Sequence, residues 1–322
     1  MEENNYISCG LCGSTEYRFL FNGKDRLHGK SGLFSYVICN RCGLVYMNPQ
    51  ISMNDLSDFY PSDYDPHQSK TGKPNQSRKK MRKKNLLPEY ILRSLNENTV
   101  LLDVGCGNGR FLDEVKKLTN TQVCGLDISK VAVQTAKENF GLDIFQGSIT
   151  EAPFEDGSFD LITAWQYLEH VPRPLEVLQK FQQLLKPNGI CIISTPNFNS
   201  MNAKIFKDKW FGLDCPRHLY IYTPDTINEL LEKAGLVVAE VRHDPSSKNL
   251  ICSLQYYFYG NNYTAEYRDK IKHATMIKFV LSPITRVFAL LKKSDNIIVY
   301  AKKKPRNKSA DNKEQPLQRK SI

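Results

Sequence analysis

The chain lacks several features that would point to a membrane or fibrous protein. Its 322 residues contain no apolar run of the length, about 20 residues, that a membrane-spanning helix needs, and no fixed-period repeat. Its first residues, MEENNYISCG, lack the basic start and the apolar stretch of a secretory signal. We therefore expect a globular chain of about two domains that works in the cytoplasm.

The net charge of +10 is concentrated in two short segments. Arg78–Lys84 carries six positive charges and residues 302–322 carry a net charge of +6, so the rest of the chain is close to neutral. Such charge runs are typical of solvated flexible segments, and we expect residues 304–322 to form a disordered basic tail. The alternative is that one or both segments attract nucleic acid or anionic lipid.

Four of the nine cysteines form two closely spaced pairs. These are Cys9 with Cys12 and Cys39 with Cys42, each pair followed by a glycine. Two residues between thiolates let one turn present both sulfurs to a tetrahedral ion. A site of four thiolates leaves no coordination position for a substrate, so the pattern predicts a structural zinc site in a small module over residues 1–50. An iron–sulfur or redox role is the alternative.

Residues 99–245 alternate apolar runs with amphipathic patterns, which is typical of parallel βαβ units, and we expect the α/β domain to extend over 99–303. Strands are predicted at Thr99–Val104, Gln122–Asp127, Asp143–Gln146, Phe159–Trp165, Gly189–Ser194, Leu236–Val241 and Asn296–Lys302. Helices are predicted near 109–118, 129–139, 173–186 and 224–234. A linker and helical lead-in at 51–98, which includes the basic run, would join this α/β domain to the cysteine module.

Two segments, about 198–222 and 246–293, exceed what a simple βαβ repeat needs. The second contains the aromatic cluster Tyr256–Tyr259 and the apolar segment Met276–Leu291. The apolar segment is too short, and too interrupted by charge and proline, to span a membrane. We expect a helical cap or core element, or else an interfacial helix at a membrane surface, since Lys292 and Lys293 follow directly.

A glycine-rich turn follows the first predicted strand. Gly105, Gly107 and Gly109 precede a helix, and glycine lets backbone amides approach a ligand closely. The turn is one residue shorter than the dinucleotide fingerprint and lacks the Lys-Ser/Thr of a P-loop. Asp127 ends the next strand, where a carboxylate can accept hydrogen bonds from both ribose hydroxyls of a nucleoside. Asp103 can fix the turn or, through water, hold a cationic amino group.

This combination resembles the class I S-adenosylmethionine-dependent methyltransferases. The glycine loop is similar to the first motif of that family, Asp127 to its ribose-binding acidic residue, and Phe154–Ile162 to the segment that leads into its fourth strand. The resemblance covers about residues 99–303. It implies a Rossmann-like, seven-stranded methyltransferase sheet with helices on both faces, and S-adenosylmethionine as the cofactor.

The resemblance also implies which residues contact the cofactor. They are Asp103, Gly105, Gly107, Asp127, Ser148, Ile149, Trp165 and Gln166. The first three would line the methionine end, the fourth the ribose, and the last two the sulfonium and adenosine. The family often places Asp after its third strand to meet the adenine amine; Ser148 and the backbone of Ile149 stand there instead and are weaker candidates.

Candidates for the acceptor side follow the fourth and fifth strands. His170 is the best-placed titratable group for a base if the acceptor must lose a proton, and a structural role is the alternative. Further along, Arg217 and His218 lie among aromatic residues in the expected lid, which suits a carbohydrate or an anionic, lipid-like or phosphorylated acceptor. Alternatively, these two residues only pin the helix that Thr223 caps. His170 and His218 are the candidate catalytic residues.

Motifs that would fix the acceptor as a nucleic-acid base are absent. The sequence has neither the Asn/Asp-Pro-Pro-Tyr/Phe motif for exocyclic amines nor a Pro-Cys nucleophile for cytosine C5 in the expected place. The cysteine module, Asn48-Pro49-Gln50 and Pro216–Leu219 together resemble zinc-ribbon methyltransferases of bacterial glycan clusters, themselves similar to ubiquinone-biosynthesis O-methyltransferases. This favours O-directed transfer to a small-molecule, sugar, or glycan- or lipid-linked acceptor. The alternatives are an RNA methyltransferase that uses the zinc module and the basic linker, and an inactive scaffold of the same fold.

Overall fold

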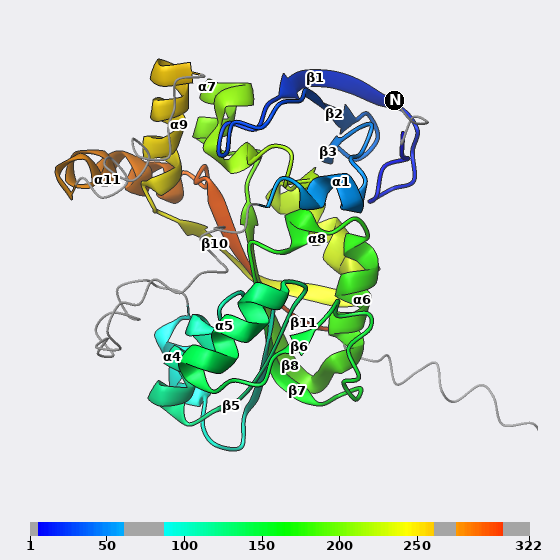
Figure 1. Ribbon diagram of the computed structural model, residues 1–322, viewed down its shortest axis with the longest axis vertical. Coiled ribbons are helices and arrows are strands. Elements are labelled where there is room, and N and C mark those ends of the chain that lie inside the picture. Colours follow the sequence, from blue (N-terminus) through cyan, green and yellow to red (C-terminus); the bar gives the residue numbers. More distant parts are fainter. Residues whose placement is uncertain (1–5, 61–86, 261–274, 305–322) are drawn as a thin grey trace, which may run out of the picture.

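The computed structural model describes residues 6–60, 87–260 and 275–304, which contain two β-sheets (Figure 1). In spatial order, the larger sheet consists of β6 (Phe145–Gln146), β5 (Gln122–Asp127), β4 (Val100–Val104), β7 (Phe159–Trp165), β8 (Leu185–Pro196), β11 (Asn296–Lys303) and β10 (Leu236–Asp244). All neighbours pair in parallel except β11, which runs antiparallel to both β8 and β10. The predicted seven-stranded α/β sheet is confirmed.

Three strands differ from the prediction by two or more residues at an end. β6 is an edge strand of two residues, because only these pair with β5. β8 begins at Leu185, before Pro187-Asn188-Gly189, because Leu185 pairs with Phe159 ahead of a register shift in β7. β10 extends to Asp244, which pairs with Asn296. Each difference is set by pairing with a strand that is distant in sequence. The hydrophobic pattern of a short segment does not predict such pairing.

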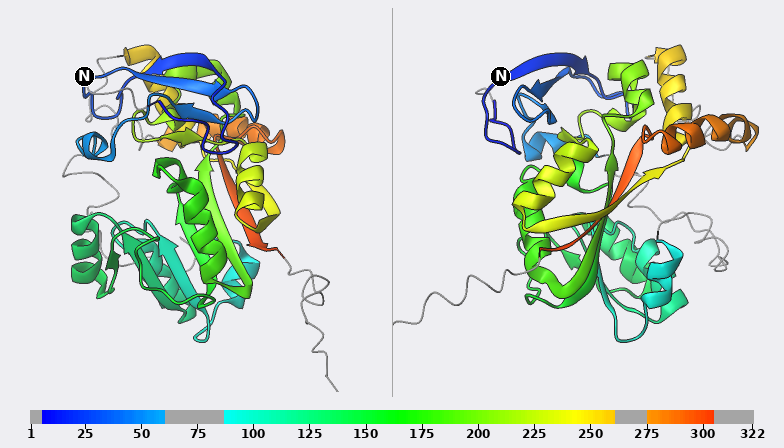
Figure 2. Two further views of the ribbon diagram at one scale, coloured as in Figure 1. Left: turned by 90° about the vertical axis from the view of Figure 1, so that its right-hand side faces the viewer. Right: turned by 180° about the vertical axis from the view of Figure 1, so that it is seen from behind.

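Helices cover both faces of the larger sheet (Figures 1 and 2). On β4, the alternation of side chains sends Leu101 into one buried cluster and Leu102 into the other. The first cluster includes residues of α3 (Glu89–Ser94), α4 (Arg110–Thr119) and α5 (Lys130–Phe140). The second includes residues of α6 (Pro174–Leu184) and α8 (Pro224–Lys233).

The smaller sheet joins the N-terminal segment to the first insertion. Its strands, in order, are β1 (Tyr17–Gly23), β2 (Phe34–Cys39), β3 (Val45–Met47) and β9 (Tyr220–Ile221). Val45 and Tyr46 of β3 pair with Ile221 and Tyr220 of β9, so a strand from the insertion covers the edge that β3 would otherwise leave open. The cysteine module therefore shares a sheet with residues about 175 positions later in the chain.

The remaining helices lie in the lead-in, after β7 and in the two insertions. They are α1 (Met53–Ser57), the 3-10 turns η1 (Leu168–His170), η2 (Lys207–Lys209) and η3 (Phe211–Leu213), and the helices α7 (Met201–Phe206), α9 (Lys248–Tyr259) and α11 (Thr275–Leu290). In the described ranges, no helix combines the length and the apolar character needed to cross a bilayer. The basic run at 78–84 and the tail after residue 304 lie outside the described residues.

Candidate functional site

The glycine loop after β4 has a backbone that favours glycine. Gly105 and Gly107 have φ angles of +70° and +53°, in the left-handed region. A Cβ atom on Gly105 would lie 2.5 Å from the ring of Tyr167, so a side chain there would also clash. The loop therefore brings backbone amides to the carboxyl edge of the sheet, where ligands bind in open α/β folds.

Asp127 fastens this loop to the end of the neighbouring strand. Its Oδ2 accepts a hydrogen bond from the Gly107 amide at 2.8 Å, and its Oδ1 accepts one from the Ser129 amide at 2.9 Å. The residue is 6% exposed. Because a carboxylate offers about four lone-pair sites, both oxygens keep capacity for two ribose hydroxyls.

Asp103 is buried beneath the loop and has one side-chain partner on the next strand. The hydroxyl of Thr163 donates to its Oδ1 at 2.6 Å. Burial, together with the nearby charge of Asp127, raises the pKa of Asp103 to about 7. Sequence reasoning missed Thr163, although a threonine at the centre of the apolar strand Phe159–Trp165 was a usable signal.

The end of β7 presents a polar atom that no described residue satisfies. The indole Nε1 of Trp165 is buried without a hydrogen-bond partner in the described part of the chain, while its ring packs edge-on against Phe111 at 5.5 Å. Gln166 follows with a φ of +50°, held by its amide's hydrogen bond to the Ser194 carbonyl. A buried donor without a partner calls for an explanation, and a ligand at this strand end would supply one.

Ser148 and Ile149 lie in the turn after β6. The Ser148 hydroxyl donates to Glu151 at 2.8 Å, and its amide donates to the same carboxylate at 3.1 Å. The Ile149 side chain is fully buried in the core. The Gly147 amide donates to the Asp127 carbonyl, which ties this turn to the end of β5. Only backbone atoms of Ile149 are left to face a ligand.

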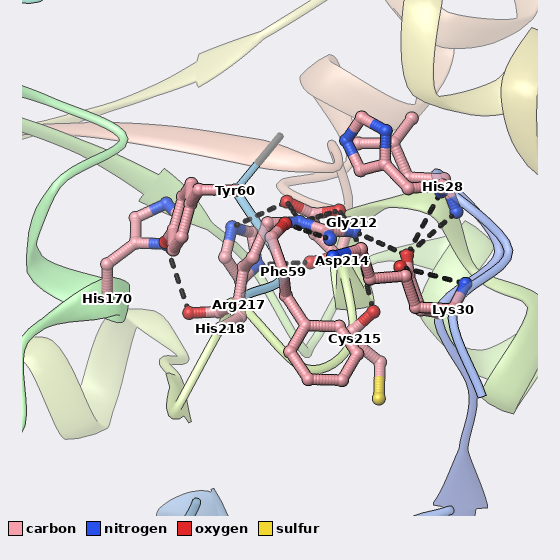
Figure 3. Close-up of polar contacts among 12 residues, drawn as sticks. His28, Lys30, Phe59, Tyr60, His170, Gly212, Asp214, Cys215, Arg217 and His218 are labelled. Carbon is pink, nitrogen blue, oxygen red and sulfur yellow. Dashed lines mark hydrogen bonds and ion pairs between the residues drawn. The ribbon is translucent and has the colours of Figure 1, made fainter. Parts of the chain in front are cut away.

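The two candidate catalytic histidines, far apart in sequence, are in contact (Figure 3). Their ring centroids lie 4.6 Å apart in an edge-to-face arrangement. The Nδ1 of His170 lies 3.0 Å from the Arg217 carbonyl and also 3.0 Å from the Tyr60 hydroxyl. A carbonyl oxygen only accepts, so Nδ1 carries the hydrogen and Nε2 keeps a free lone pair. The same argument holds for His218, whose Nδ1 donates to the Gly212 carbonyl at 2.9 Å.

Arg217 lies at the centre of a buried ion network behind these histidines (Figure 3). Its side chain is fully buried, and its Nη2 donates to Asp25 at 2.9 Å and to Asp214 at 2.8 Å. Its Nη1 donates to the Phe59 carbonyl at 3.1 Å. Burial alone would raise the pKa of Asp214, but Arg217 and His218 hold it well below its usual value. Asp25, which sequence reasoning missed, brings the N-terminal module into this network.

Glu169 is a buried acid beside the histidines that sequence reasoning also missed. It is fully buried, and neither of its carboxyl oxygens makes a hydrogen bond of good geometry within the described part of the chain. Its Oε1 lies 3.9 Å from Nε2 of His218. Burial raises the pKa of Glu169 to about 8, whereas burial and the neighbouring His218 lower the pKa of His170 to about 3. Burial also lowers the pKa of His218, so at neutral pH Glu169 and both histidines are mainly in their neutral forms.

The raised pKa of Glu169 predicts a specific dependence of stability on pH. Between its ordinary value of 4.5 and about 8, the folded chain holds a proton that the unfolded chain releases, so this contribution to the free energy of unfolding is lost as the pH rises through that window. Glu169→Gln keeps the shape of the neutral acid but cannot ionise. We expect its stability advantage over the parent, measured by urea unfolding, to be larger at pH 8 than at pH 5. A constant difference across this range would contradict the burial argument.

The four cysteines of the N-terminal module come together as one cluster. Sγ of Cys9 lies 3.4 Å from that of Cys42, and Sγ of Cys12 lies 3.5 Å from that of Cys39. All four sulfurs are within 4.8 Å of one another. Four thiolates around a tetrahedral zinc ion, with Zn–S bonds of about 2.3 Å, are separated by roughly 3.8 Å, so the cluster fits such an ion.

Comparisons with known proteins match parts of the chain. Residues 76–241 match a family described as a methyltransferase domain. A ubiquinone biosynthesis O-methyltransferase of Pasteurella multocida is 38% identical over 125 residues, which cover 34% of this chain and 51% of that protein. A protein of the same name from Cereibacter sphaeroides is 34% identical over 151 residues, covering 44% of this chain and 61% of that protein. The chain thus spans about half to three fifths of the length of these curated relatives.

A solved structure with a similar backbone is an S-adenosylmethionine-dependent methyltransferase from Archaeoglobus fulgidus. It has a TM-score of 0.46 and 20% sequence identity, and the match covers 70% of this chain and 92% of that one. The family match covers the glycine loop, Asp127 and His170. Since it spans more than half of the chain, and since the predicted sheet is present, the chain belongs to the methyltransferase-domain family, as a class I, S-adenosylmethionine-dependent member.

Proposed function

We propose that this chain transfers the methyl group of S-adenosylmethionine to a hydroxyl oxygen of a small-molecule, sugar, or glycan- or lipid-linked acceptor. The observation that carries the proposal is the glycine loop, whose Gly107 amide is bonded to Asp127 at the carboxyl edge of the sheet, with His170 following the β7 strand end. The names of the relatives, which are O-methyltransferases, support an oxygen acceptor. A cytoplasmic location stays a prediction.

The chain's own residues would hold and orient the two substrates. When bound, the cofactor supplies an electrophilic methyl group; transfer forms the O–C bond, breaks the S–C bond and leaves S-adenosylhomocysteine. Backbone amides of the glycine loop and Asp103 would meet the methionine end, and Asp127 the ribose. His170 would accept a hydrogen bond from the acceptor hydroxyl at Nε2. The hydroxyl proton becomes strongly acidic as the O–C bond forms, so even an imidazole of low pKa can receive it and pass it to solvent.

The first test is calorimetric titration of the full chain with S-adenosylmethionine and S-adenosylhomocysteine, followed by transfer of labelled methyl to sugar-nucleotide, glycolipid and RNA acceptors. We expect binding of both ligands and an O-methylated product. Methylation of RNA alone, lost when Arg78–Lys84 is neutralised, would replace the proposal by the RNA alternative. Failure to bind either ligand would favour the inactive scaffold.

His170→Ala should lower turnover more than it lowers cofactor affinity. A lost acid–base or orienting group typically costs about 10²–10⁴ in rate, whereas the residue is not expected to touch the cofactor. The measurement is kcat on the identified acceptor beside the dissociation constant for S-adenosylmethionine. Because His170 is neutral above about pH 3, the parent rate should show no His170 limb between pH 5 and 9. An unaltered kcat would remove the assignment.

We further propose that Cys9, Cys12, Cys39 and Cys42 hold one structural zinc ion. The close packing of their four sulfurs supports this, since each ligand is a soft thiolate of the kind zinc prefers. Cys39→Ser should lower the zinc content from one ion per chain and destabilise the N-terminal sheet. The matched control is Cys252→Ser in α9, a buried cysteine outside the cluster. If metal-free Cys39→Ser were as stable as the zinc-loaded parent, the structural role would be contradicted.

A further inference from the structure

Helices α9 and α11 lie side by side at one end of the molecule (Figures 1 and 2), and both contribute exposed apolar side chains to the surface there. We call it the α9/α11 surface, and it is formed by Phe258, Phe279, Val280, Val287, Leu290 and Leu291. Phe279 is 80% exposed, Leu290 83% and Phe258 73%. Single exposed apolar residues are common in folded proteins, but a patch that continues over two neighbouring helices marks an interaction surface.

α11 is attached to the body by its opposite face. The Thr285 side chain is 4% exposed, and its hydroxyl donates to the Pro245 carbonyl at 2.7 Å. Leu281, on the same side, packs against the cluster between α7, α9 and the smaller sheet. A helix on the surface of a globular protein normally turns polar residues outward. On α11, the outward half carries apolar side chains, so the helix is suited to a second, apolar contact.

Within the described residues of α9 and α11, every charged side chain is cationic. Neither α9 nor residues 275–293 contain an aspartate or glutamate, whereas Lys278, Arg286 and Lys292 are exposed on or directly after α11. The acidic residues that flank the two helices in sequence among described positions are Asp244, which is half-buried, and Asp295, which is 5% exposed. An apolar face bordered by cations suits a partner that is apolar inside and anionic outside.

We propose that the α9/α11 surface docks the protein on a bilayer that contains anionic lipid, with α11 lying in the interface. Sixteen residues of helix are about 24 Å long, enough to lie along a membrane surface and too short to cross it. The exposed aromatics at the end of α9 are side chains that favour the headgroup level. A second copy of the chain fits less well, because a two-fold contact would bring Lys278 and Arg286 toward their own equivalents.

The surface lies near the edge of the sheet that carries the candidate site. β10 and β8 both run antiparallel to β11, so the end of β10, from which α9 follows, is at the same edge as the ends of β8 and the other parallel strands. Docking through α9 and α11 would therefore bring the loop edge of the sheet toward the lipid. The docking itself does not depend on the proposed methyl transfer.

The test is co-flotation of the full chain with vesicles of phosphatidylcholine alone or with about 30% phosphatidylglycerol. We expect binding to the anionic vesicles only, weakened severalfold at about 0.5 M salt. Lys278→Gln with Arg286→Gln should weaken it about tenfold to thirtyfold, since each cation near the surface contributes about 1 kcal/mol. Phe279→Ser with Leu290→Ser should weaken it by at least tenfold.

Matched controls distinguish binding through this surface from nonspecific lipid binding by exposed apolar side chains. Phe19→Ser with Leu33→Ser removes the same two residue types at positions 58% and 64% exposed on the N-terminal module, and should leave flotation unchanged. Equal loss in both double variants, or absence of flotation with anionic vesicles, would overturn the proposal. Light scattering completes the test: a dimer that Phe279→Ser with Leu290→Ser converts to monomer, without vesicle binding by the parent, would assign the surface to a second copy instead.

Discussion

Replacing Asp127 by alanine should weaken binding of S-adenosylmethionine by at least a hundredfold. The carboxylate holds the Gly107 amide at 2.8 Å and the Ser129 amide at 2.9 Å, and under the proposed function it also accepts two ribose hydroxyls. Hydrogen bonds to a charged group contribute about 1.5–3 kcal/mol each, so the loss of two ribose contacts alone corresponds to a factor of a hundred or more. Calorimetric titration of the variant with the cofactor measures this directly.

Two further variants make this result specific. Asp127→Asn keeps the size, but it turns an amide donor toward either the Gly107 or the Ser129 amide, so we expect affinity between those of the parent and Asp127→Ala. Asp160→Ala is the matched control, because Asp160 also accepts from a backbone amide, that of Val100 at 2.9 Å, but at the opposite edge of the sheet. It should change affinity by less than about twofold. Equal affinities of Asp127→Ala and the parent would remove Asp127 from the cofactor site.

The larger sheet could be predicted because its signals are local. The apolar run at β4 is buried on both faces, with Leu101 and Leu102 in different clusters, as parallel strands between helix layers require. The start of α8 could also be predicted from the sequence. The Thr223 side chain accepts a hydrogen bond from the Thr226 amide, and Pro224 occupies the first helical turn. Neither feature needs information from elsewhere in the chain.

The smaller sheet could not be predicted, because its last strand, β9, lies about 175 residues after β3 in the sequence. β9 has two residues, Tyr220 and Ile221, and its pairing with β3 is a tertiary contact with no periodic signal. The sequence suggested a lid at this position and a separate module at 1–50. Packing of Trp210 and Leu213 into one cluster with Tyr36 and Val45 joins the two. Strand pairing over such a distance is decided by burial.

The contacts of the candidate site that follow from strand order could be predicted from the sequence, whereas those that depend on ion pairs could not. Gly107 and Asp127 follow adjacent parallel strands, whose carboxyl ends meet at one edge, so their contact could be anticipated. His170 and His218 were named separately, and their contact was not foreseen. Asp25 lies 192 residues from Arg217, and a single aspartate in a loop carries no sign of its partner. Geometry alone identifies it.

Replacing Arg217 by methionine should destabilise the protein by about 3–5 kcal/mol, because it leaves the buried carboxylate of Asp25 and the partly buried one of Asp214 without their cation. The guanidinium also donates to the Phe59 carbonyl, so three chain segments lose a shared partner. The measurement is urea unfolding of the zinc-loaded protein at pH 7. The Arg217 carbonyl accepts a hydrogen bond from His170, so disturbing this segment should also disturb the histidine. We therefore expect the rate of methyl transfer to fall by a larger factor than the affinity for the cofactor.

A matched control and a double variant test the cause. Arg93→Met removes an arginine whose side chain is 76% exposed and paired with Glu89 four residues earlier, and should cost less than about 1 kcal/mol. Asp25→Asn combined with Arg217→Met removes one of the stranded charges, so its cost should be smaller than the sum of the two single costs. Equal losses for Arg217→Met and Arg93→Met would mean that the buried network adds nothing beyond a surface ion pair. Strict additivity of the two single costs would mean that Asp25 and Arg217 are not coupled, and that the N-terminal module contacts the histidines by other means, such as the hydrogen bond from the Tyr36 hydroxyl to the His218 carbonyl.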